Sequence, residues 1–152
     1  MTTPSTYYKH NLELARRIYK AYEYNEFTPA IVYGPLGWGK SSYAMKVAAL
    51  IYGDFKRYDY EAVKEHLVLH PKDFIKRCRK NTREPCLIWD DAGLWLYALE
   101  DKHPFVRAVA KYMNVARTGW GGIIFTTPHP TWIIHKVRKL PAVTTVKIMK
   151  AE

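Results

Sequence analysis

The chain has 152 residues, of which 48% are hydrophobic and 25% are charged. This length fits one compact domain, and the composition excludes an intrinsically disordered chain. With 24 Lys and Arg against 14 Asp and Glu, the formal net charge is +10, which favours polyanionic partners, nucleic acid above all.

Residue patterns argue against two further classes of protein. No apolar run approaches the roughly 18 to 20 residues that span a bilayer, and the polar, aromatic start differs from a secretory signal, so we expect a cytoplasmic protein with no membrane span. Cys78 and Cys86, without a C-x-x-C pair, argue against a disulfide framework and against a cysteine zinc site. The absence of Gln is typical of thermophilic proteins, which avoid heat-labile amides.

The first half of the chain alternates helical and strand patterns. Residues 5–24 have the spacing of an amphipathic helix, so residues 1–27 are expected to be a helical segment that leads into the core. Residues 30–33 predict a buried strand, and a glycine-rich loop separates it from a helix over 41–52. Residues 58–81 are predicted to be mainly helical, with a short strand at 67–69 and a new helix from Pro71. The stretch 72–83 forms a basic face.

The second half continues this alternation. Residues 86–89 predict a strand, and residues 94–115 predict one or two helices interrupted near Pro104 and closed by Gly119 to Gly122. Residues 122–127 predict another strand, followed by a short helix over 131–139 and a last strand over 142–148. Strands that alternate with helices indicate an α/β fold with a parallel sheet covered on both faces, and we place this core at 28–152 within a single domain.

One segment has the pattern of a phosphate-binding loop. Residues 34–41 match G-x-x-x-x-G-K-[ST] at every fixed position, after a predicted strand and before a predicted helix. Glycines let backbone N–H groups point at phosphate oxygens, and the helix start adds its positive end. We therefore expect Lys40 to reach the β- and γ-phosphates and the Ser41 hydroxyl to ligate Mg²⁺. The expected ATP-binding residues are Gly34, Pro35, Gly37, Trp38, Gly39, Lys40, Ser41 and Ser42.

Three residues, one bulky and two acidic, leave alternatives open. Trp38 stands where a small residue is commoner, and it either packs on the domain or covers the nucleotide. Asp90 follows the strand 86–89, where a carboxylate can hold Mg²⁺, and Asp91 is placed to orient or deprotonate the attacking water. The alternative is that Asp90 and Asp91 cap the helix that follows them, an alternative that applies more to Asp91 than to Asp90, and the two roles can coexist. Asp91 is shorter than the Glu that comparable ATPases use there.

Hydroxyl and guanidinium side chains complete the candidate site. Thr126 and Thr127 end the strand 122–127, at the edge where open α/β sheets bind ligands, and we select Thr127 as a catalytic candidate. Threonine is also simply a good strand residue. Arg107, Arg117 and Arg138 are candidates for an arginine finger supplied by a neighbouring subunit, with Arg117 preferred. His129 and His135 form no metal site with any partner in the sequence.

These motifs resemble those of P-loop ATPases with an additional strand between the phosphate-loop strand and the acidic strand. Residues 34–41, 87–91 and 114–130 are similar to the FtsK and HerA type of DNA-pumping ATPases, to zonula occludens toxin-like phage assembly proteins, and to AAA+ ATPases of archaeal viruses and plasmids. The resemblance implies a three-layer sandwich with strand order 5-1-4-3-2, Mg-ATP as ligand, and ring assembly. Pro128 stands where many of these proteins have Gln.

The expected function is ATP hydrolysis, slow in isolation, coupled to work on DNA by an oligomer. Ring formation is favoured by the candidate finger and by the lack of sequence for a helical lid after the last strand. A small nucleoside or nucleotide kinase shares the loop and the size, but its acceptor pocket and arginine-bearing lid are not recognisable. A nucleotide-gated DNA-binding or assembly module with little turnover is a third possibility, suggested by Asp91 in place of Glu.

Overall fold

The computed structural model describes residues 12–80, 82–98, 103–133 and 135–149. Their elements in chain order are α2 (Glu13–Glu23), β1 (Thr28–Tyr33), α3 (Lys40–Tyr52), α4 (Tyr60–Glu65), β2 (Leu67–Val68), α5 (Pro71–Cys78), β3 (Glu84–Trp89), α6 (Ala92–Ala98), α7 (Pro104–Gly119), β4 (Trp120–Thr127), a 3-10 turn η1 (Pro130–Trp132), α8 (His135–Arg138) and β5 (Thr144–Lys147). None of the helices described is long and apolar enough to cross a bilayer.

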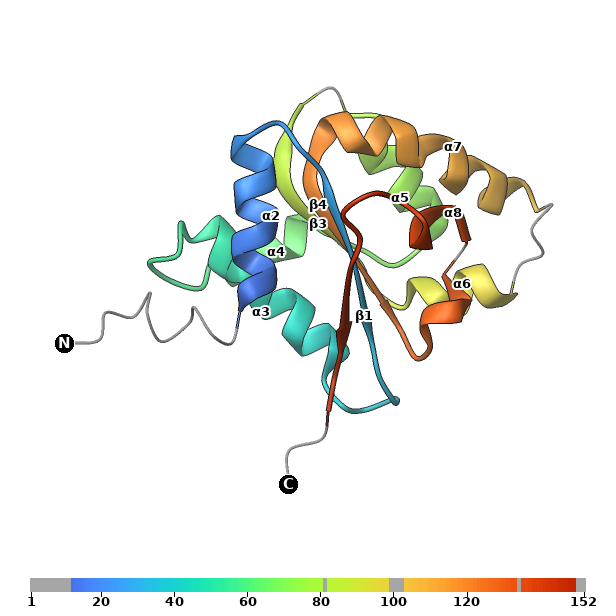
Figure 1. The fold of residues 1–152 in the computed structure, drawn as a ribbon, viewed down its shortest axis with the longest axis horizontal. Helices are drawn as coiled ribbons and strands as arrows, with labels where there is room; N and C mark the ends of the chain where they lie inside the picture. Colours follow the sequence, from blue (N-terminus) through green and yellow to red (C-terminus); the bar gives the residue numbers. More distant parts are fainter. Residues whose placement is uncertain (1–11, 81, 99–102, 134, 150–152) are drawn as a thin grey trace.

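The strands form one parallel sheet in the order β2-β3-β4-β1-β5. This confirms the α/β class, and the strand order agrees with the one that the resemblance implied. Parallel neighbours require crossover connections, and the helices between the strands supply them. In Figure 1, α2, α3 and α4 lie to the left of the strands, and α5 to α8 lie to their right. The chain therefore has three layers, with the sheet in the middle.

Alternating strand residues divide the core into two halves. Ala30, Val32, Ile88 and Ile124 pack with the helices α2 and α3 on one face of the sheet. Their neighbours Ile31, Leu87, Trp89, Ile123 and Phe125 pack with α5 and α7 on the other face. Side chains that are apolar on both faces explain why these strands appear in the sequence as continuous hydrophobic runs.

The helix α2 is part of the core. Its apolar stripe of Leu14, Ala15, Ile18 and Ala21 is buried, and Ile18 lies directly over β4. A Cβ added at Gly122 would meet Ile18 Cγ1 at 2.7 Å, so glycine is needed for this close approach. The expected helix over 5–24 thus begins at Glu13 within the described residues, and its first part, 5–11, lies outside them.

Two element boundaries differ from the sequence-based prediction. α7 ends at Gly119, as expected, but β4 begins at Trp120 rather than Gly122, so that Gly121 is a strand residue under α2. The predicted helix 131–139 is divided into η1 and α8, since Ile133 is extended with ψ of 136°. The interruption near Pro104 is confirmed, because α7 begins there; residues 99–102 lie outside the described part.

Candidate functional site

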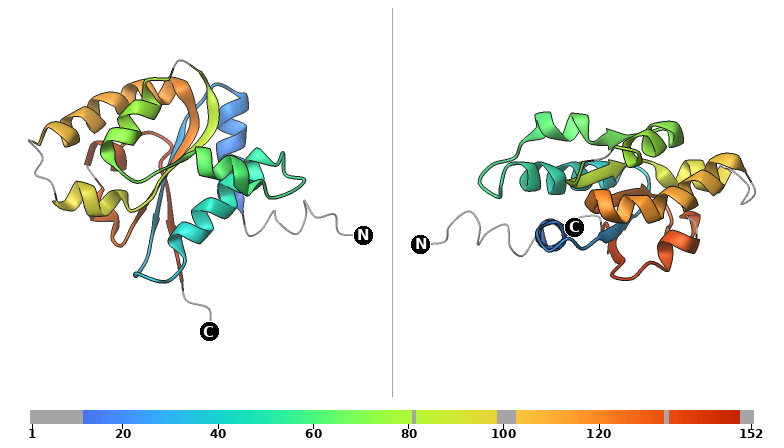
Figure 2. Two further views of the ribbon diagram at one scale, coloured as in Figure 1. Left: turned by 180° about the vertical axis from the view of Figure 1, so that it is seen from behind. Right: turned by 90° about the horizontal axis from the view of Figure 1, so that it is seen from above.

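The loop between β1 and α3 lies at the carboxyl edge of the sheet. Gly37 and Gly39 have φ of 79° and 92°, a left-handed conformation that glycine adopts at little cost, and Gly39 caps the start of α3. The loop occupies the same lower end of the molecule as the end of β5 in Figure 1 and in the left view of Figure 2. The first N–H groups of α3 have no partner within the helix, so the loop and the helix start present donors to an anion.

Lys40 is folded into this loop. Only 5% of its surface is exposed, and its Nζ donates a hydrogen bond to the carbonyl oxygen of Pro35 at 3.1 Å. The ammonium group therefore lies inside the curl of the loop, next to the donors of the helix start. This arrangement places one full positive charge and a set of N–H groups together, which is the chemistry that binds phosphate oxygens.

Three polar side chains meet where β3 and β4 end. The hydroxyl of Ser41, in the first turn of α3, donates to Asp90 Oδ1 at 2.6 Å, and the hydroxyl of Thr126 donates to the same oxygen at 2.7 Å. The backbone N–H of Asp91 in turn donates to Thr126 Oγ1 at 2.8 Å. These bonds hold the Asp90 carboxylate against the start of the helix that carries Lys40.

The register of the sheet explains this meeting. Trp89 of β3 is paired with Phe125 of β4, so the next residues, Asp90 and Thr126, lie opposite one another. Asp90 and Thr126 also continue the alternation of Ile88 and Ile124, whose side chains face α2 and α3. The two residues therefore share the face of the sheet on which Ser41 lies.

Thr127 faces the opposite side. Its hydroxyl donates to the carbonyl oxygen of His129 at 2.9 Å, and a Cβ added at Gly93 of α6 would collide with Thr127 Oγ1. Thr127 is fully buried at this contact. The threonine that contacts Asp90 is thus Thr126. The alternation of side chains along β4 indicates this choice once it is known which face of the sheet α3 covers.

Asp91 has an unusual environment. Its φ of 54° lies in the left-handed region, and α6 begins at the next residue. Burial raises the pKa of the Asp91 carboxyl, the charge of Asp90 raises this pKa further, and the charge of Lys40 lowers it. Among the residues that the structure describes, the Asp91 carboxylate accepts no hydrogen bond, so it is open to a water molecule.

The oxygen donors fit a hard cation that also binds phosphate. Mg²⁺ is usually held by one or two carboxylates together with substrate phosphates and water. Asp90 and Ser41, in contact with each other, provide one carboxylate and one hydroxyl beside the loop. Within the described ranges no three His, Cys, Asp or Glu side chains form a metal-binding group.

Trp38 and Leu36 are at the exposed side of the loop. Leu36 is 71% exposed and Trp38 is 40% exposed, and among the described residues no ring contact involves Trp38. Of the two alternatives for Trp38, packing against the domain core is therefore not what the structure has. Pro35 and Ser42 are also exposed at this loop, whereas Gly34 is buried beside Ile148.

Arg117, the preferred arginine, lies apart from this cluster. Arg117 is exposed in the last turn of α7, directly before β4 begins, and β4 is about 25 Å long at roughly 3.3 Å per residue. It lines a hollow of about 630 Å³ at the amino edge of the sheet, with Phe27 and Leu140. Arg107 is exposed near the other end of α7, and Arg138 Nε donates to the carbonyl oxygen of Ile133 at 2.9 Å. Arg117 therefore cannot reach the loop of its own chain.

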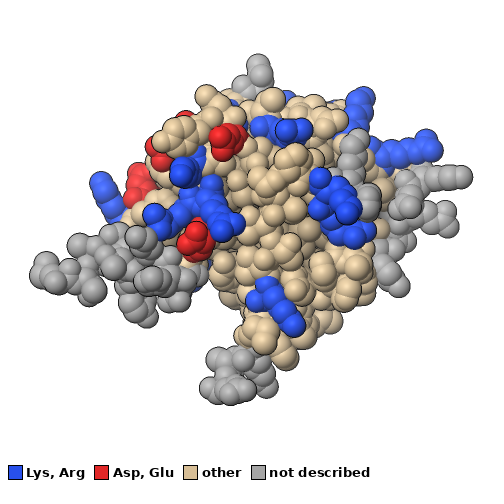
Figure 3. Space-filling model, viewed as in Figure 1, with Lys and Arg blue, Asp and Glu red and all other residues tan. Residues whose placement is uncertain are grey.

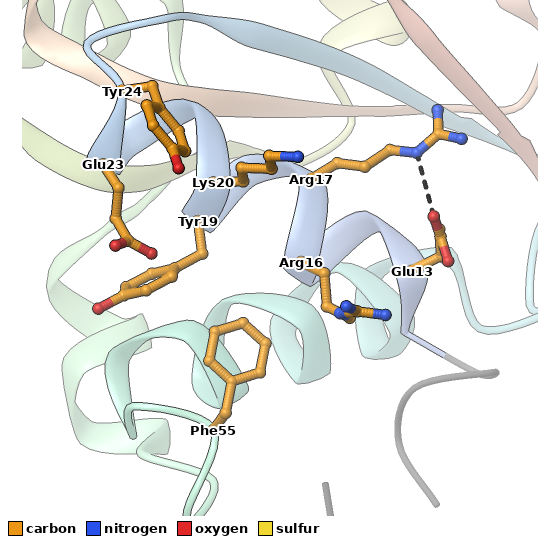
Figure 4. A pocket seen from close by; sticks show the side chains of 8 residues that line it. All are labelled: Glu13, Arg16, Arg17, Tyr19, Lys20, Glu23, Tyr24 and Phe55. Atoms are coloured by element: carbon orange, nitrogen blue, oxygen red, sulfur yellow. Dashed lines mark ion pairs between the residues drawn. The ribbon is translucent and has the colours of Figure 1, made fainter. Parts of the chain in front are cut away.

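A further hollow of about 550 Å³ lies on the outer side of α2, away from the loop (Figure 4). The rings of Tyr19 and Phe55 meet edge to face there with centroids 5.3 Å apart. Glu13 and Glu23 stand at the two ends of this helix with basic residues between them, and Glu13 pairs with Arg17 at 3.5 Å. The mixed charges give this hollow no preference for an anion.

Comparison with known proteins relates the chain to two proteins of archaeal viruses. It is 37% identical over 136 residues to uncharacterized protein B-251 of Sulfolobus spindle-shape virus 1, and the aligned region covers 84% of this chain and 54% of that protein. It is 33% identical over 119 residues to uncharacterized protein ORF286 of Acidianus two-tailed virus, and the aligned region covers 74% of this chain and 40% of that protein. The chain thus spans about half the length of these relatives or less. No protein-family model matches it.

Proposed function

We propose that this chain is a P-loop ATPase that binds Mg-ATP at the loop between β1 and α3, hydrolyses it, and uses the cycle in work on DNA as an oligomer. The observation that carries the proposal is the contact of Ser41 with Asp90, at 2.6 Å, directly after the loop that encloses the Lys40 ammonium. A phosphate cradle and an oxygen site for Mg²⁺ therefore lie side by side. Bound Mg²⁺ would supply charge neutralisation for the phosphates.

The binding step uses the loop and Lys40. In the proposed complex the β- and γ-phosphates accept hydrogen bonds from the N–H groups at the start of α3, and Lys40 Nζ exchanges the Pro35 carbonyl for a phosphate oxygen. Thr126 contributes by orientation, because its hydroxyl holds Asp90 Oδ1 in place. Trp38, exposed beside the loop, is available to cover the nucleotide.

The hydrolytic step uses Asp91. A water oxygen attacks the γ-phosphorus, the bond from that phosphorus to the bridging oxygen breaks, ADP leaves, and the Asp91 carboxylate accepts the water proton. A raised pKa makes Asp91 a stronger base than an ordinary aspartate, as long as it is deprotonated at the working pH. Its short side chain also favours a second candidate, a nucleotide-gated binding module with little turnover.

DNA as the polyanionic partner is supported by the net charge of +10. Electrostatic attraction to phosphates is independent of base sequence, so this part of the proposal names no sequence preference. A steep loss of affinity with rising salt is expected.

The nucleotide-binding proposal is tested with Lys40→Ala. Because Lys40 supplies the positive charge inside the loop, the variant should lose the thermal stabilisation that Mg-ATP gives the unchanged protein. That stabilisation corresponds to about 2.7 kcal/mol at a ligand concentration of 100 times Kd. Differential scanning fluorimetry and isothermal titration calorimetry with Mg-ATP measure it.

Lys46→Ala is the matched control, since Lys46 is exposed on the same helix. This variant should keep the full stabilisation. If Lys40→Ala is stabilised by Mg-ATP as strongly as the control, the assignment of the loop is wrong. Release of phosphate from ATP separates an ATPase from a gated module, and transfer to a nucleoside acceptor would instead identify a kinase.

A further inference from the structure

The two faces of the sheet carry very different charges. On the face covered by α2, α3 and α4, these helices hold six Lys and Arg against four Glu. On the other face, residues 71–80 and the helix α7 hold eight Lys and Arg against one acid, Asp73. Most of the excess positive charge among the described residues therefore lies on one side.

Figure 3 shows this asymmetry from one direction. The Asp and Glu side chains that are visible gather on the side of α2, whereas Lys and Arg also extend over the side of α7 and α8. On α2 the basic residues lie between Glu13 and Glu23, which stand at the two ends of the helix, as Figure 4 shows. No such neutralising pattern exists on α7, whose sequence contains no acid.

The basic side chains on α5 and α7 point outward. Phe74 and Cys78 anchor α5 to the core, and Val109 and Met113 anchor α7, so the opposite sides of both helices face solvent. Lys76 and Lys80 are exposed on that side of the segment 71–80, and Lys111 is exposed on α7. None of these three lysines forms an ion pair with another described residue.

The surface near these lysines has two further features, a hydrogen bond between α5 and α7 and a hollow beside β2. Arg79 Nε donates to the Tyr112 hydroxyl at 2.9 Å, which ties α5 to α7 and leaves the two terminal nitrogens of Arg79 without a partner among the described residues. Beside β2, a hollow of about 360 Å³ is lined by Asp73, Lys76, Arg77 and Lys80, and the buried Nη2 of Arg77 has no hydrogen-bond partner in the described part of the chain. A buried donor of this kind is costly unless an acceptor reaches it.

We infer that the outer surface of α5 and α7 binds the sugar–phosphate backbone of a nucleic acid. The basic side chains Lys76, Arg79, Lys80 and Lys111 contact successive phosphates, and the hollow beside Arg77 receives a phosphate oxygen. The surface binds through backbone charge and therefore has no preference for base sequence. This inference rests on the nucleic-acid part of the proposed function and is independent of nucleotide binding at the loop.

Two triple variants of equal charge test it. The first carries Lys76→Gln, Lys80→Gln and Lys111→Gln, and the matched control carries Lys20→Gln, Lys56→Gln and Lys64→Gln, all exposed residues on the α2 side of the sheet. Both have a net charge lower by three, and Lys and Gln have similar helix propensity. Fluorescence anisotropy with labelled duplex DNA, single-stranded DNA and RNA measures affinity at several salt concentrations.

The nucleic-acid affinity of the first variant should depend less steeply on salt concentration than that of the unchanged protein. Each phosphate contact contributes a slope of about 0.9 for duplex DNA and about 0.7 for a single strand, so losing three contacts lowers the slope of log K against log salt by about 2 to 3. The control should keep the slope of the unchanged protein. Circular dichroism and Mg-ATP titration of both variants verify that fold and nucleotide site are intact.

Four results would overturn the inference. An equal decrease of the salt slope in both triple variants would show that net charge alone determines binding. Unchanged slopes in both variants would place the phosphate contacts on another surface. If the unchanged protein binds anionic phospholipid vesicles but no nucleic acid, the surface serves a membrane. If it binds none of these probes, the nucleic-acid part of the proposed function fails, whereas the Lys40→Ala comparison still decides the ATPase part.

Discussion

At the scale of single residues, Asp91 combines a left-handed backbone, a raised pKa and a neighbouring carboxylate. A non-glycine residue at positive φ is held there by its surroundings, here by the N–H bond to Thr126 and by the start of α6. These contacts hold the backbone of Asp91, whereas its carboxylate accepts no hydrogen bond from another described residue. Its role in the proposed hydrolysis can therefore be separated from its role in structure.

Asp91→Asn should lower the rate of ATP hydrolysis by roughly 10²- to 10⁴-fold, which is the typical contribution of a general base, and should leave Mg-ATP affinity nearly unchanged. In the unchanged protein the rate should fall as the pH falls, because the protonated carboxyl accepts no proton, with a midpoint above the ordinary Asp value of 3.8. Phosphate release between pH 4 and pH 8 measures both effects. Hydrolysis that persists in Asp91→Asn would assign the base to another group.

The same pKa shift has a consequence for stability. A carboxyl whose pKa is raised in the folded state binds its proton more tightly there than in the unfolded state, so its contribution to stability falls as the pH rises through that pKa. At neutral pH the charged Asp91 therefore costs stability in the ligand-free protein. The Asn variant, which carries no charge, should have a slightly higher Tm at pH 7, and this gain should disappear at pH 4.

At the scale of elements, Arg83 joins the end of α2 to the junction of α7 and β4. Its Nη2 donates to the carbonyl oxygens of Ala21, Tyr22 and Glu26, and its Nη1 donates to those of Thr118 and Trp120. These carbonyls come from two segments that lie far apart in the sequence, residues 21–26 and residues 118–120. Only a planar group with several donors can serve them together.

Arg83→Ala should lower the free energy of unfolding by about 2 to 4 kcal/mol, because charged hydrogen bonds are lost and carbonyl oxygens are left without partners. Arg83→Lys should recover little of this loss, since one ammonium cannot span both groups of carbonyls. The control is Arg57→Ala, which removes an exposed ion pair with Asp59 and should cost at most about 1 kcal/mol. Urea unfolding followed by circular dichroism gives these values; equal losses in both variants would contradict the bridging role.

At the scale of the whole molecule, Arg117 and the loop between β1 and α3 lie at opposite edges of the sheet. One chain cannot bring them together, but neighbouring copies in a ring can. This geometry fits the proposal that the finger acts on the site of another subunit. It also makes that proposal testable by mixing variants.

Lys40→Ala lacks the nucleotide site but keeps Arg117, whereas Arg117→Ala keeps the site and lacks the finger. Each variant alone should lose ATPase activity, and Arg117→Ala should lose it by about 10³-fold or more. An equimolar mixture of the two variants should recover part of the ATPase activity, because a subunit with an intact loop can then lie beside a subunit with an intact Arg117. ATPase rate and light scattering measure activity and assembly. Recovery with Arg107→Ala in place of Arg117→Ala would move the finger to Arg107, and no recovery with either would exclude a finger in trans.

The sequence by itself determined the alternation of strands and helices, the loop at 34–41 and the acidic end of β3, because each depends on residues close together in the chain. Periodicity, glycine positions and the order of apolar and acidic residues are local signals. They sufficed for the parallel sheet and, with the resemblance, for its strand order.

Only the tertiary structure decided which of two adjacent threonines meets Asp90. Thr126 and Thr127 have the same chemistry, and the choice depends on the register of β4 against β3 and on the side of the sheet that α3 covers. The same is true of Gly121, which is expected between the helix and the strand but lies within β4 under α2. The Arg83 bridge and the charge difference between the two faces also join residues that are distant in the chain, and long-range contacts of this kind leave no periodic pattern in a single sequence.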